Sequence, residues 1–206
     1  QMCIRDRRRA VMKKKTLKII DILITVATVI CLIVTGLFVY RNIVYEHVIV
    51  SGTSMQDTLD SGDYGLMNVT ESRKQNIQRF DIVIFDLSEE QKNYDIIKRV
   101  IALPGETIKI DTTGTIYINN EELDQSSFLV DYQKDYTYSN NGVACGEEYK
   151  VPNDAYFCLG DNRKVSLDSR VRGALSRDKI DGVLRVIYKH CNEEGKACKS
   201  IPARWF

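Results

Sequence analysis

Residues 95–103 read Asp-Ile-Ile-Lys-Arg-Val-Ile-Ala-Leu, an apolar run interrupted by two adjacent cations. Successive side chains of a β-strand point to opposite faces, so Lys98 shares one face with Ile96 and Val100 while Arg99 lies on the other. Between two β-branched neighbours Lys98 would lose contact with water, which lowers the pKa of a lysine. The stretch predicts a strand in which Lys98 is either a neutral general base, with a pKa of about 7 or 8, or a lysine whose stem covers a sheet edge.

Short strand-like runs, separated by turn residues, continue on both sides of this stretch. The turns include Pro104-Gly105 and Thr113-Gly114, and the chain shows no long amphipathic helix pattern. We therefore expect a mainly β fold with an antiparallel, barrel-like sheet domain, in which residues 121–150 form an insertion of undefined structure. Besides residues 95–103, the predicted strands are His47–Val50, Tyr64–Val69, Asp81–Phe85, Thr107–Ile110, Thr115–Ile118, Ala155–Leu159 and Gly182–Tyr188.

An uncharged apolar segment precedes the strands. From Ile22 to Tyr40 it contains no charged residue and no proline, and at about 1.5 Å per residue it would cross a hydrocarbon core of about 30 Å. A cleaved secretory signal is the alternative, but its apolar core would be shorter and would end at small residues. Basic residues crowd the N-terminal side and only Arg41 lies close on the other, so we expect the N-terminus in the cytoplasm.

These patterns divide the chain into three predicted parts. Residues 1–15 form a basic cytoplasmic tail, residues 16–40 a single transmembrane helix, and residues 41–206 an extracytoplasmic β-rich domain. Residues 1–11 fit none of these parts well, and Met12, followed by three lysines, would be a natural start. We therefore expect a single-pass protein of the cell membrane in which residues 1–11 are not native.

Composition limits the classes of function. The 206 residues, 44% of them hydrophobic, suffice for one domain with a core, and a formal net charge of +1 argues against a nucleic-acid partner. No two cysteines form a CxxC pair, so we expect no zinc, and neither another metal nor a cofactor is required. Cys191 and Cys198 are close enough in sequence to bridge in an oxidising exterior, although spacing alone assigns no connectivity.

A second stretch, residues 48–59, reads Val-Ile-Val-Ser-Gly-Thr-Ser-Met-Gln-Asp-Thr-Leu. A serine such as Ser54, on a turn after a strand, exposes its hydroxyl while nearby backbone N–H groups can bind an oxyanion. The same residue types also form ordinary surface turns. As a nucleophile Ser54 would need a base: a Ser-His-Asp triad is one alternative, but neither His47 nor His190 lies in a motif. Lys98 is the other candidate.

A third stretch, residues 160–170, reads Gly-Asp-Asn-Arg-Lys-Val-Ser-Leu-Asp-Ser-Arg. It is either a loop that holds other loops through side-chain hydrogen bonds or a solvated turn. Taken together and in this order behind one apolar span, the stretches make the chain from Met12 to about Tyr188 resemble the type I signal peptidases of the Gram-positive type. The matching residues are Ser54-Met55, Lys98-Arg99, Leu103-Pro104-Gly105 and the stretch 160–170.

The resemblance implies roles for individual residues. Ser54 is the expected acylating nucleophile and Lys98 its base, with Ser166 orienting the lysine. Two ion pairs are implied to support the loops of the site. They are Arg99 with Asp161, and Asp168 with Arg170.

The resemblance also implies an oxyanion site and a substrate site. The backbone N–H of Ser54 would be one oxyanion donor, and the second is unassigned because Gly52 stands where some members carry a side-chain donor. The hydroxyls of Thr53 and Ser51 are possible substitutes. Signal peptides with small residues one and three positions before the cut would bind as an extended strand. The residues implied to line their two shallow pockets are Val48, Val50, Met55, Leu59, Ile96 and Ile97.

We therefore expect a monomeric, membrane-anchored serine endopeptidase that cleaves signal peptides from exported preproteins and has the lipid bilayer as its other partner. A weak or inactive homologue, acting as a membrane-anchored substrate-binding or assembly module, is the alternative. Its one hint is Asp57, which stands where the family usually has proline; we expect Asp57→Pro to leave activity equal or higher. A self-cleaving repressor-type Ser-Lys protease would carry a DNA-binding domain where this chain has an apolar span.

Overall fold

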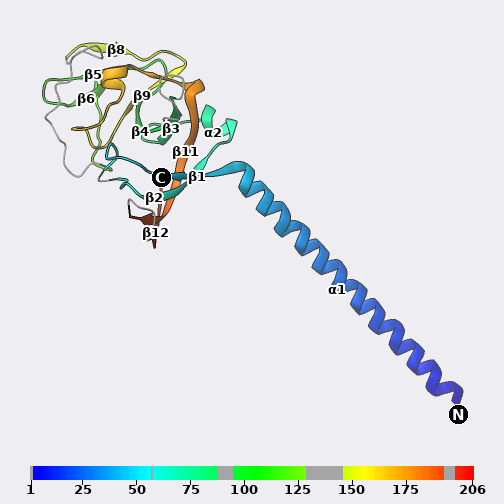
Figure 1. The fold of residues 1–206 in the computed structure, drawn as a ribbon. Helices are drawn as coiled ribbons and strands as arrows, with labels where there is room; N and C mark the ends of the chain where they lie inside the picture. Colours follow the sequence, from blue (N-terminus) through cyan, green and yellow to red (C-terminus); the bar gives the residue numbers. More distant parts are fainter. Residues whose placement is uncertain (1, 57, 88–94, 129–145, 193–197) are drawn as a thin grey trace. The chain divides into compact units, whose positions relative to one another are not determined.

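The computed structural model describes residues 2–56, 58–87, 95–128, 146–192 and 198–206, and for residues 2–14, 71 and 72 it describes the backbone alone. Asp57 and residues 129–145 of the predicted insertion therefore lie outside the described residues. The chain divides into two units, Gln1–Val44 and Tyr45–Phe206 (Figure 1).

The first unit is a single helix, α1 (Met2–Val44). Its segment Lys15–Val44 is the one helix in the described part of the chain that is long and apolar enough to cross a membrane, and an 18-residue window within it has a mean hydropathy of 2.8. Threonine hydroxyls within it donate to carbonyls of the preceding turn, Thr25 to Asp21 O and Thr35 to Cys31 O, each at 2.8 Å. These polar groups are thus satisfied inside the helix, as an apolar environment requires.

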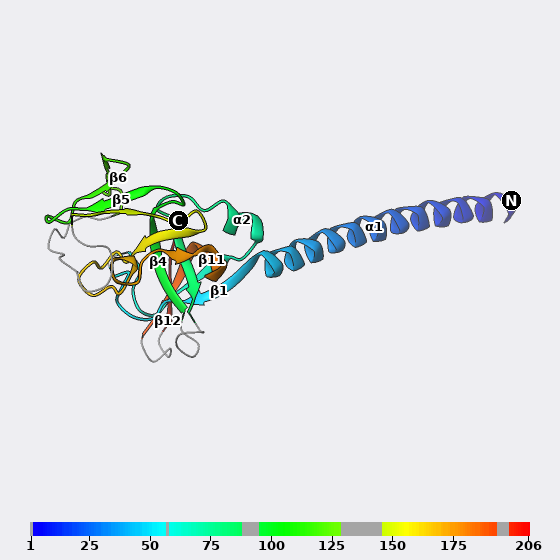
Figure 2. The ribbon, with the colours of Figure 1, turned by 90° about the horizontal axis from the view of Figure 1, so that it is seen from above.

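The second unit is built on an antiparallel sheet with the strand order β1-β2-β11-β3-β4-β9-β10, and β12 pairs with β11 beside this path. The central strand β11 pairs with β2, β3 and β12, and its register shifts let it curve through the unit (Figures 1 and 2). The strands are β1 (Tyr45–Ile49), β2 (Asp63–Asn68), β3 (Ile82–Asp86), β4 (Asp95–Ala102), β9 (Ala155–Leu159), β10 (Leu175–Ser176), β11 (Ile180–Cys191) and β12 (Cys198–Trp205).

A smaller antiparallel sheet has the order β7-β6-β5-β8. Three short helices complete the described part of the unit, and one of them, α3, is capped at its N-terminus by Asp168, whose side chain accepts from the Arg170 N–H. The remaining strands are β5 (Thr107–Ile110), β6 (Ile116–Ile118), β7 (Glu121–Glu122) and β8 (Glu148–Lys150), and the helices are α2 (Glu71–Gln75), α3 (Ser169–Arg172) and the 3₁₀-helix η1 (Arg177–Lys179).

The structure confirms the expected mainly β fold behind one apolar helix, and all eight predicted strands are present. Sequence patterns missed β7, β8, β10 and β12. The first three have two or three residues each, too few to show a period. β12 carries mostly exposed polar residues and a proline, so it lacks the apolar alternation that marks a strand.

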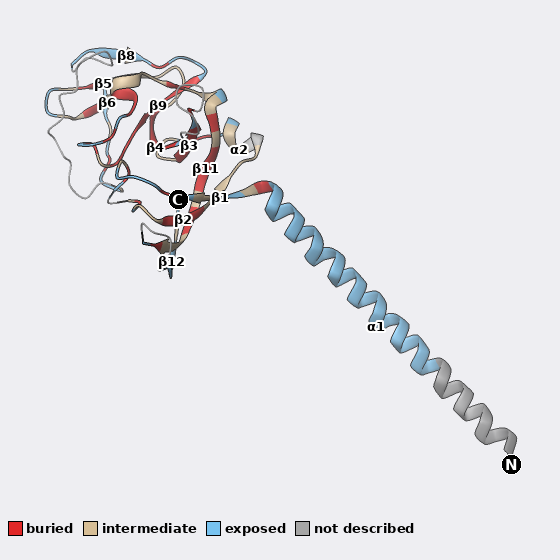
Figure 3. Cartoon of the chain, viewed as in Figure 1, coloured by how far each residue is buried: buried red, intermediate tan, exposed pale blue. Residues whose placement is uncertain are grey.

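Three buried clusters form the core, and the buried segments lie mainly in the strands (Figure 3). One cluster combines Val50, Met55 and Leu59 with Ile82 and Leu184. Met55 is 2% exposed and Leu59 1% exposed, and burying a side chain of this size contributes about 1.5–3 kcal/mol. The segment around the predicted nucleophile is thereby seated on the core.

Candidate active site

Lys98 and Ser54 meet although 44 residues separate them. Lys98 Nζ donates to Ser54 Oγ at 2.8 Å and to Ile97 O at 2.9 Å. The lysine lies on β4 and is 3% exposed. Loss of solvent on burial lowers the pKa of Lys98 from 10.5 to about 8, although the negative charge of Asp168 acts in the opposite direction. About a tenth of the amine is therefore neutral at pH 7, far more than for an unperturbed lysine.

Ser54 lies on a segment that we call the Ser54 loop, made of the described residues 50–56 and 58–63. Its turns are closed by backbone bonds from Gln56 N–H to Thr53 O at 3.1 Å and from Leu59 N–H to Met55 O at 2.8 Å. Gly52, with φ +88°, adopts the left-handed conformation that favours glycine. The sharp turn at Gly52 therefore needs glycine.

A second segment, the 160–170 loop, fastens the Ser54 backbone from the other side. Asn162 N–H donates to Ser54 O at 3.1 Å. Gly160 packs so closely that an added Cβ would lie 2.4 Å from Ser54 O and 2.2 Å from Ser166 Oγ. Glycine is required there because a Cβ atom cannot approach that near.

The two implied ion pairs are both formed. Arg99 holds Asp161 through two parallel bonds, Nε to Oδ1 at 2.9 Å and Nη2 to Oδ2 at 2.6 Å. Arg99 also donates Nη1 to Phe80 O at 2.9 Å, and its guanidinium lies 4.2 Å from the centre of the Phe128 ring. Both charged groups are buried, so the bidentate geometry compensates their loss of water.

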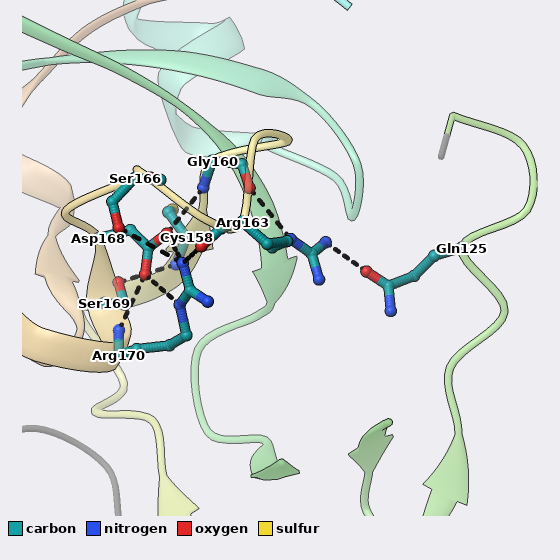
Figure 4. Close-up of polar contacts among 8 residues, drawn as sticks. All are labelled: Gln125, Cys158, Gly160, Arg163, Ser166, Asp168, Ser169 and Arg170. Atoms are coloured by element: carbon teal, nitrogen blue, oxygen red, sulfur yellow. Dashed lines mark hydrogen bonds and ion pairs between the residues drawn. The ribbon is translucent and has the colours of Figure 1, made fainter. Parts of the chain in front are cut away.

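Asp168 and Arg170 form the other pair, with Nε to Oδ1 at 2.8 Å and Nη2 to Oδ2 at 2.9 Å. Asp168 also accepts from Gly160 N–H at 3.0 Å, and Arg170 donates to Arg163 O at 2.8 Å. Figure 4 shows these contacts closing the 160–170 loop on itself. The loop is thus held by charged hydrogen bonds within its own span.

Arg163 and Gln125 support the same loop, and the sequence analysis missed both. Arg163 Nε donates to Gly160 O at 3.0 Å and Nη2 to Gln125 Oε1 at 2.5 Å (Figure 4). Burial lowers the pKa of Arg163 to about 10, which leaves it protonated at neutral pH. Arg163 stands in the Gly-Asp-Asn-Arg run and was open to prediction, but nothing around Gln125 marks it in sequence.

A groove of about 400 Å³ opens beside Ser54 and Lys98. β1 forms one edge strand of the sheet, and β4 pairs with β9 only from Arg99 onward, so residues 95–98 have an unpaired edge within the described sheet. An extended peptide can add to such edges. The groove is lined by five of the six predicted substrate residues, Val48, Val50, Met55, Ile96 and Ile97, and also by Ser51, Gly52 and Thr53.

Two predicted site residues take other positions. Leu59, within the Ser54 loop, is buried in the core cluster and is absent from the groove lining. Ser166 is buried, but its hydroxyl makes no hydrogen bond in the described part of the chain. The structure therefore brings Ser166 to the site without a direct bond to Lys98.

The model of the family "Signal peptidase, peptidase S26" matches residues 19–189 of the chain. The chain belongs to this signal peptidase family. Signal peptidase I of Bacillus amyloliquefaciens is 29% identical over 185 residues, which cover 88% of this chain and 95% of the relative. Signal peptidase IB of Staphylococcus aureus (strain COL) is 32% identical over 179 residues, covering 83% of this chain and 88% of the relative.

The crystal structure of a signal peptidase I from Enterococcus faecalis V583 is 31% identical and covers 53% of this chain and 97% of its own, with a TM-score of 0.40. Membership of the signal peptidase family makes the chain a serine peptidase, so the expected enzyme class is confirmed.

Proposed function

We propose that this chain is a membrane-anchored signal peptidase that cleaves signal peptides from exported preproteins, with Ser54 as nucleophile and Lys98 as general base. The contact of 2.8 Å between Lys98 Nζ and Ser54 Oγ carries the proposal. The lowered pKa of Lys98, about 8, supports it because a protonated amine cannot accept the serine proton.

Acylation uses the neutral form of the amine. The Ser54 hydroxyl attacks the carbonyl carbon of the scissile bond while its proton passes to Lys98 Nζ. The resulting ammonium then gives that proton to the leaving amine, and an ester joins the signal peptide to Ser54 Oγ. In the second step Lys98 takes a proton from water, whose attack on the ester releases the signal peptide and restores the serine.

The negative charge on the carbonyl oxygen needs donors. The Ser54 N–H donates no backbone hydrogen bond within the described part of the chain and serves as the first donor. Thr53 and Ser51 both line the groove, and either hydroxyl can supply the second donor near Gly52. Thr53→Val and Ser51→Ala distinguish the two hydroxyls, because loss of the second donor lowers the rate of cleavage.

Substrate selection follows from the groove. An extended chain added between β1 and β4 would place alternate side chains against Val48, Val50, Met55, Ile96 and Ile97. The floor of the groove is formed by side chains that are themselves buried in the core, among them Met55 at 2% exposure. A floor this firm cannot recede for large side chains, so small residues one and three positions before the cut are favoured.

For topology we propose that residues 1–15 are a cytoplasmic tail, that residues 16–40 cross the membrane, and that residues 41–206 act outside as a monomer. The apolar helix segment Lys15–Val44 supports the span. The disulfide between Cys191 and Cys198 supports an exterior location, because such bonds persist in oxidising compartments.

The test is cleavage of a purified preprotein by the detergent-solubilised full chain. We expect Ser54→Ala and Lys98→Met each to abolish detectable processing. Lys109→Met, which removes another strand lysine far from the groove, is the matched control and keeps full activity. Undiminished processing by either dyad variant would refute the dyad. A folded unmutated chain that binds a signal peptide without cutting it would instead support the binding-module alternative.

A further inference from the structure

The Ser54 loop is closed at its base by backbone bonds. Val50 N–H donates to Asp63 O at 2.8 Å, and Gly62 N–H donates to Val50 O at 2.9 Å. Residues 50 and 63 are therefore fixed side by side, with Ser54 in the loop between them. What holds the far limb of this loop decides how firmly Ser54 faces Lys98.

One side chain of the C-terminal strand reaches the loop at two points. Arg204 of β12 donates Nη1 to Thr58 O at 2.9 Å and Nη2 to Asp63 Oδ2 at 2.5 Å. Asp63 is 1% exposed and also accepts from Asp60 N–H at 3.1 Å and contacts His190 Nδ1 at 2.9 Å. Arg204 thereby ties the base of the loop to the limb that follows the serine, through a planar group that loses little freedom on bonding.

β12 is in turn held against β11 and the core. Arg204 pairs with Ile187, and Phe206 N–H donates to Arg185 O at 2.9 Å. Ile201 and Phe206 pack against the same cluster that seats the Ser54 loop. Strand β12 is therefore anchored on β11 and the core, and this anchoring fixes the position of Arg204.

The disulfide closes the other end of this strand pair. Cys191 ends β11 and is bonded to Cys198, the first residue of β12. Cys191 N–H also donates to Gly62 O at 2.8 Å, and a Cβ on Gly62 would lie 2.0 Å from Cys191 O. The covalent link is thus in direct backbone contact with the base of the Ser54 loop.

We propose that Arg204 is a positioning residue for Ser54 and that the disulfide-linked strand β12 is the support through which it acts. The family match ends at residue 189, before β12 begins, so this support lies outside the part shared with the family model. The expected effect of Arg204 on kcat rests on the proposed peptidase function, whereas its expected effect on hydrogen exchange in the Ser54 loop does not.

The kinetic test compares Arg204→Met with Arg204→Lys in the full chain. Because displaced reacting groups lose rate and not binding, we expect Arg204→Met to lower kcat about tenfold with KM nearly unchanged. Lysine keeps the charge toward Asp63 and should recover part of kcat. Lys199→Met, which removes an exposed cation from the same strand, is the control and should match the unmutated chain. A rise in KM with kcat unchanged in Arg204→Met would overturn the proposal.

Hydrogen exchange supplies a readout that is independent of activity. Arg204→Met should accelerate exchange of the Thr58, Leu59 and Gly62 amides. Ile116→Val, a core change in the smaller sheet, controls for general destabilisation and should leave these amides unchanged. Unaltered exchange in Arg204→Met overturns the inference. Accelerated exchange in a chain whose unmutated form cuts no preprotein would support the tie and refute the proposed function.

The role of the disulfide is tested with a double-mutant cycle of Cys198→Ser and Arg204→Met. Cys198→Ser should lower kcat in the unmutated background, and it should lower kcat much less when Arg204→Met is already present, since both changes release the same limb of the loop. Fully additive effects of the two changes would overturn the role of the disulfide as support for Arg204.

Discussion

The two loops that meet at the site are held by different forces. The 160–170 loop is stabilised by buried charged groups, among them Asp161, Asp168 and Arg170, each with hydrogen-bonding partners. The Ser54 loop depends mainly on Met55 and Leu59 in the core and on short backbone bonds, with one charged tie from Arg204 to Asp63 at its base. Removing one partner from a buried charged pair lowers the free energy of unfolding sharply, because the other charge stays buried. Truncating an apolar side chain lowers it in proportion to the cavity that is left.

The difference suggests a division of tasks. The 160–170 loop is a frame that holds the backbone of Ser54 through Asn162 and brings the charge of Asp168 near Lys98, where it raises the pKa that burial lowers. The Ser54 loop has to present a hydroxyl, so it is pressed against this frame by core packing. Removing a charged partner within the frame should therefore cost mainly stability, whereas changes in the seat, or in the contact between the two loops, should lower activity as well.

The largest effect is expected where the frame loses one charge. Asp161→Ala would leave the guanidinium of Arg99 buried without its carboxylate, and breaking such a pair costs about 3–5 kcal/mol. Denaturant unfolding of the solubilised chain measures this loss. The double change Asp161→Ala with Arg99→Met should be closer to the unmutated stability, and an equal or larger loss in the double variant would contradict the explanation.

The next effect concerns the apolar seat of the serine. Met55→Ala removes a buried side chain by which the Ser54 loop packs on the core, and truncations of this kind cost about 2–5 kcal/mol. The exposed loop can partly collapse, so we expect the lower end of that range together with a clear fall in kcat. Ile118→Ala, a truncation in the smaller sheet, is the control: it should lose stability with kcat retained.

Contact between the two loops is tested by Gly160→Ala. The new methyl group would lie 2.4 Å from Ser54 O, and relief of such overpacking costs about 1–3 kcal/mol. Because the strain falls on the Ser54 backbone, preprotein cleavage should fall more than the melting temperature suggests. An alanine at Gly36 in α1, where an added Cβ meets nothing within 4 Å, is the control. Normal kinetics for Gly160→Ala would show that the close approach is unimportant.

The strands were predictable because each carries a local apolar pattern, and Lys98 was predictable because its neighbours on β4 implied burial. The contacts between distant segments were not. Nothing near Gln125 or Arg204 shows that either side chain reaches a loop dozens of residues away, since such contacts follow from how the sheets fold together. Ser166 illustrates the converse: its sequence position matches the family pattern, yet its hydroxyl makes no bond to Lys98 in the described structure.

The smallest effect is a shift in the pH dependence of cleavage. The base must be neutral, so kcat/KM should rise with pH and level off above the Lys98 pKa of about 8. The charge of Asp168 raises that pKa, so Asp168→Asn should lower it and move the rising limb to lower pH. Asp111→Asn in the smaller sheet should leave the profile in place. A limb that stays fixed or moves upward in Asp168→Asn would show that the frame does not set the basicity of the lysine, and the division between the two loops would then fail.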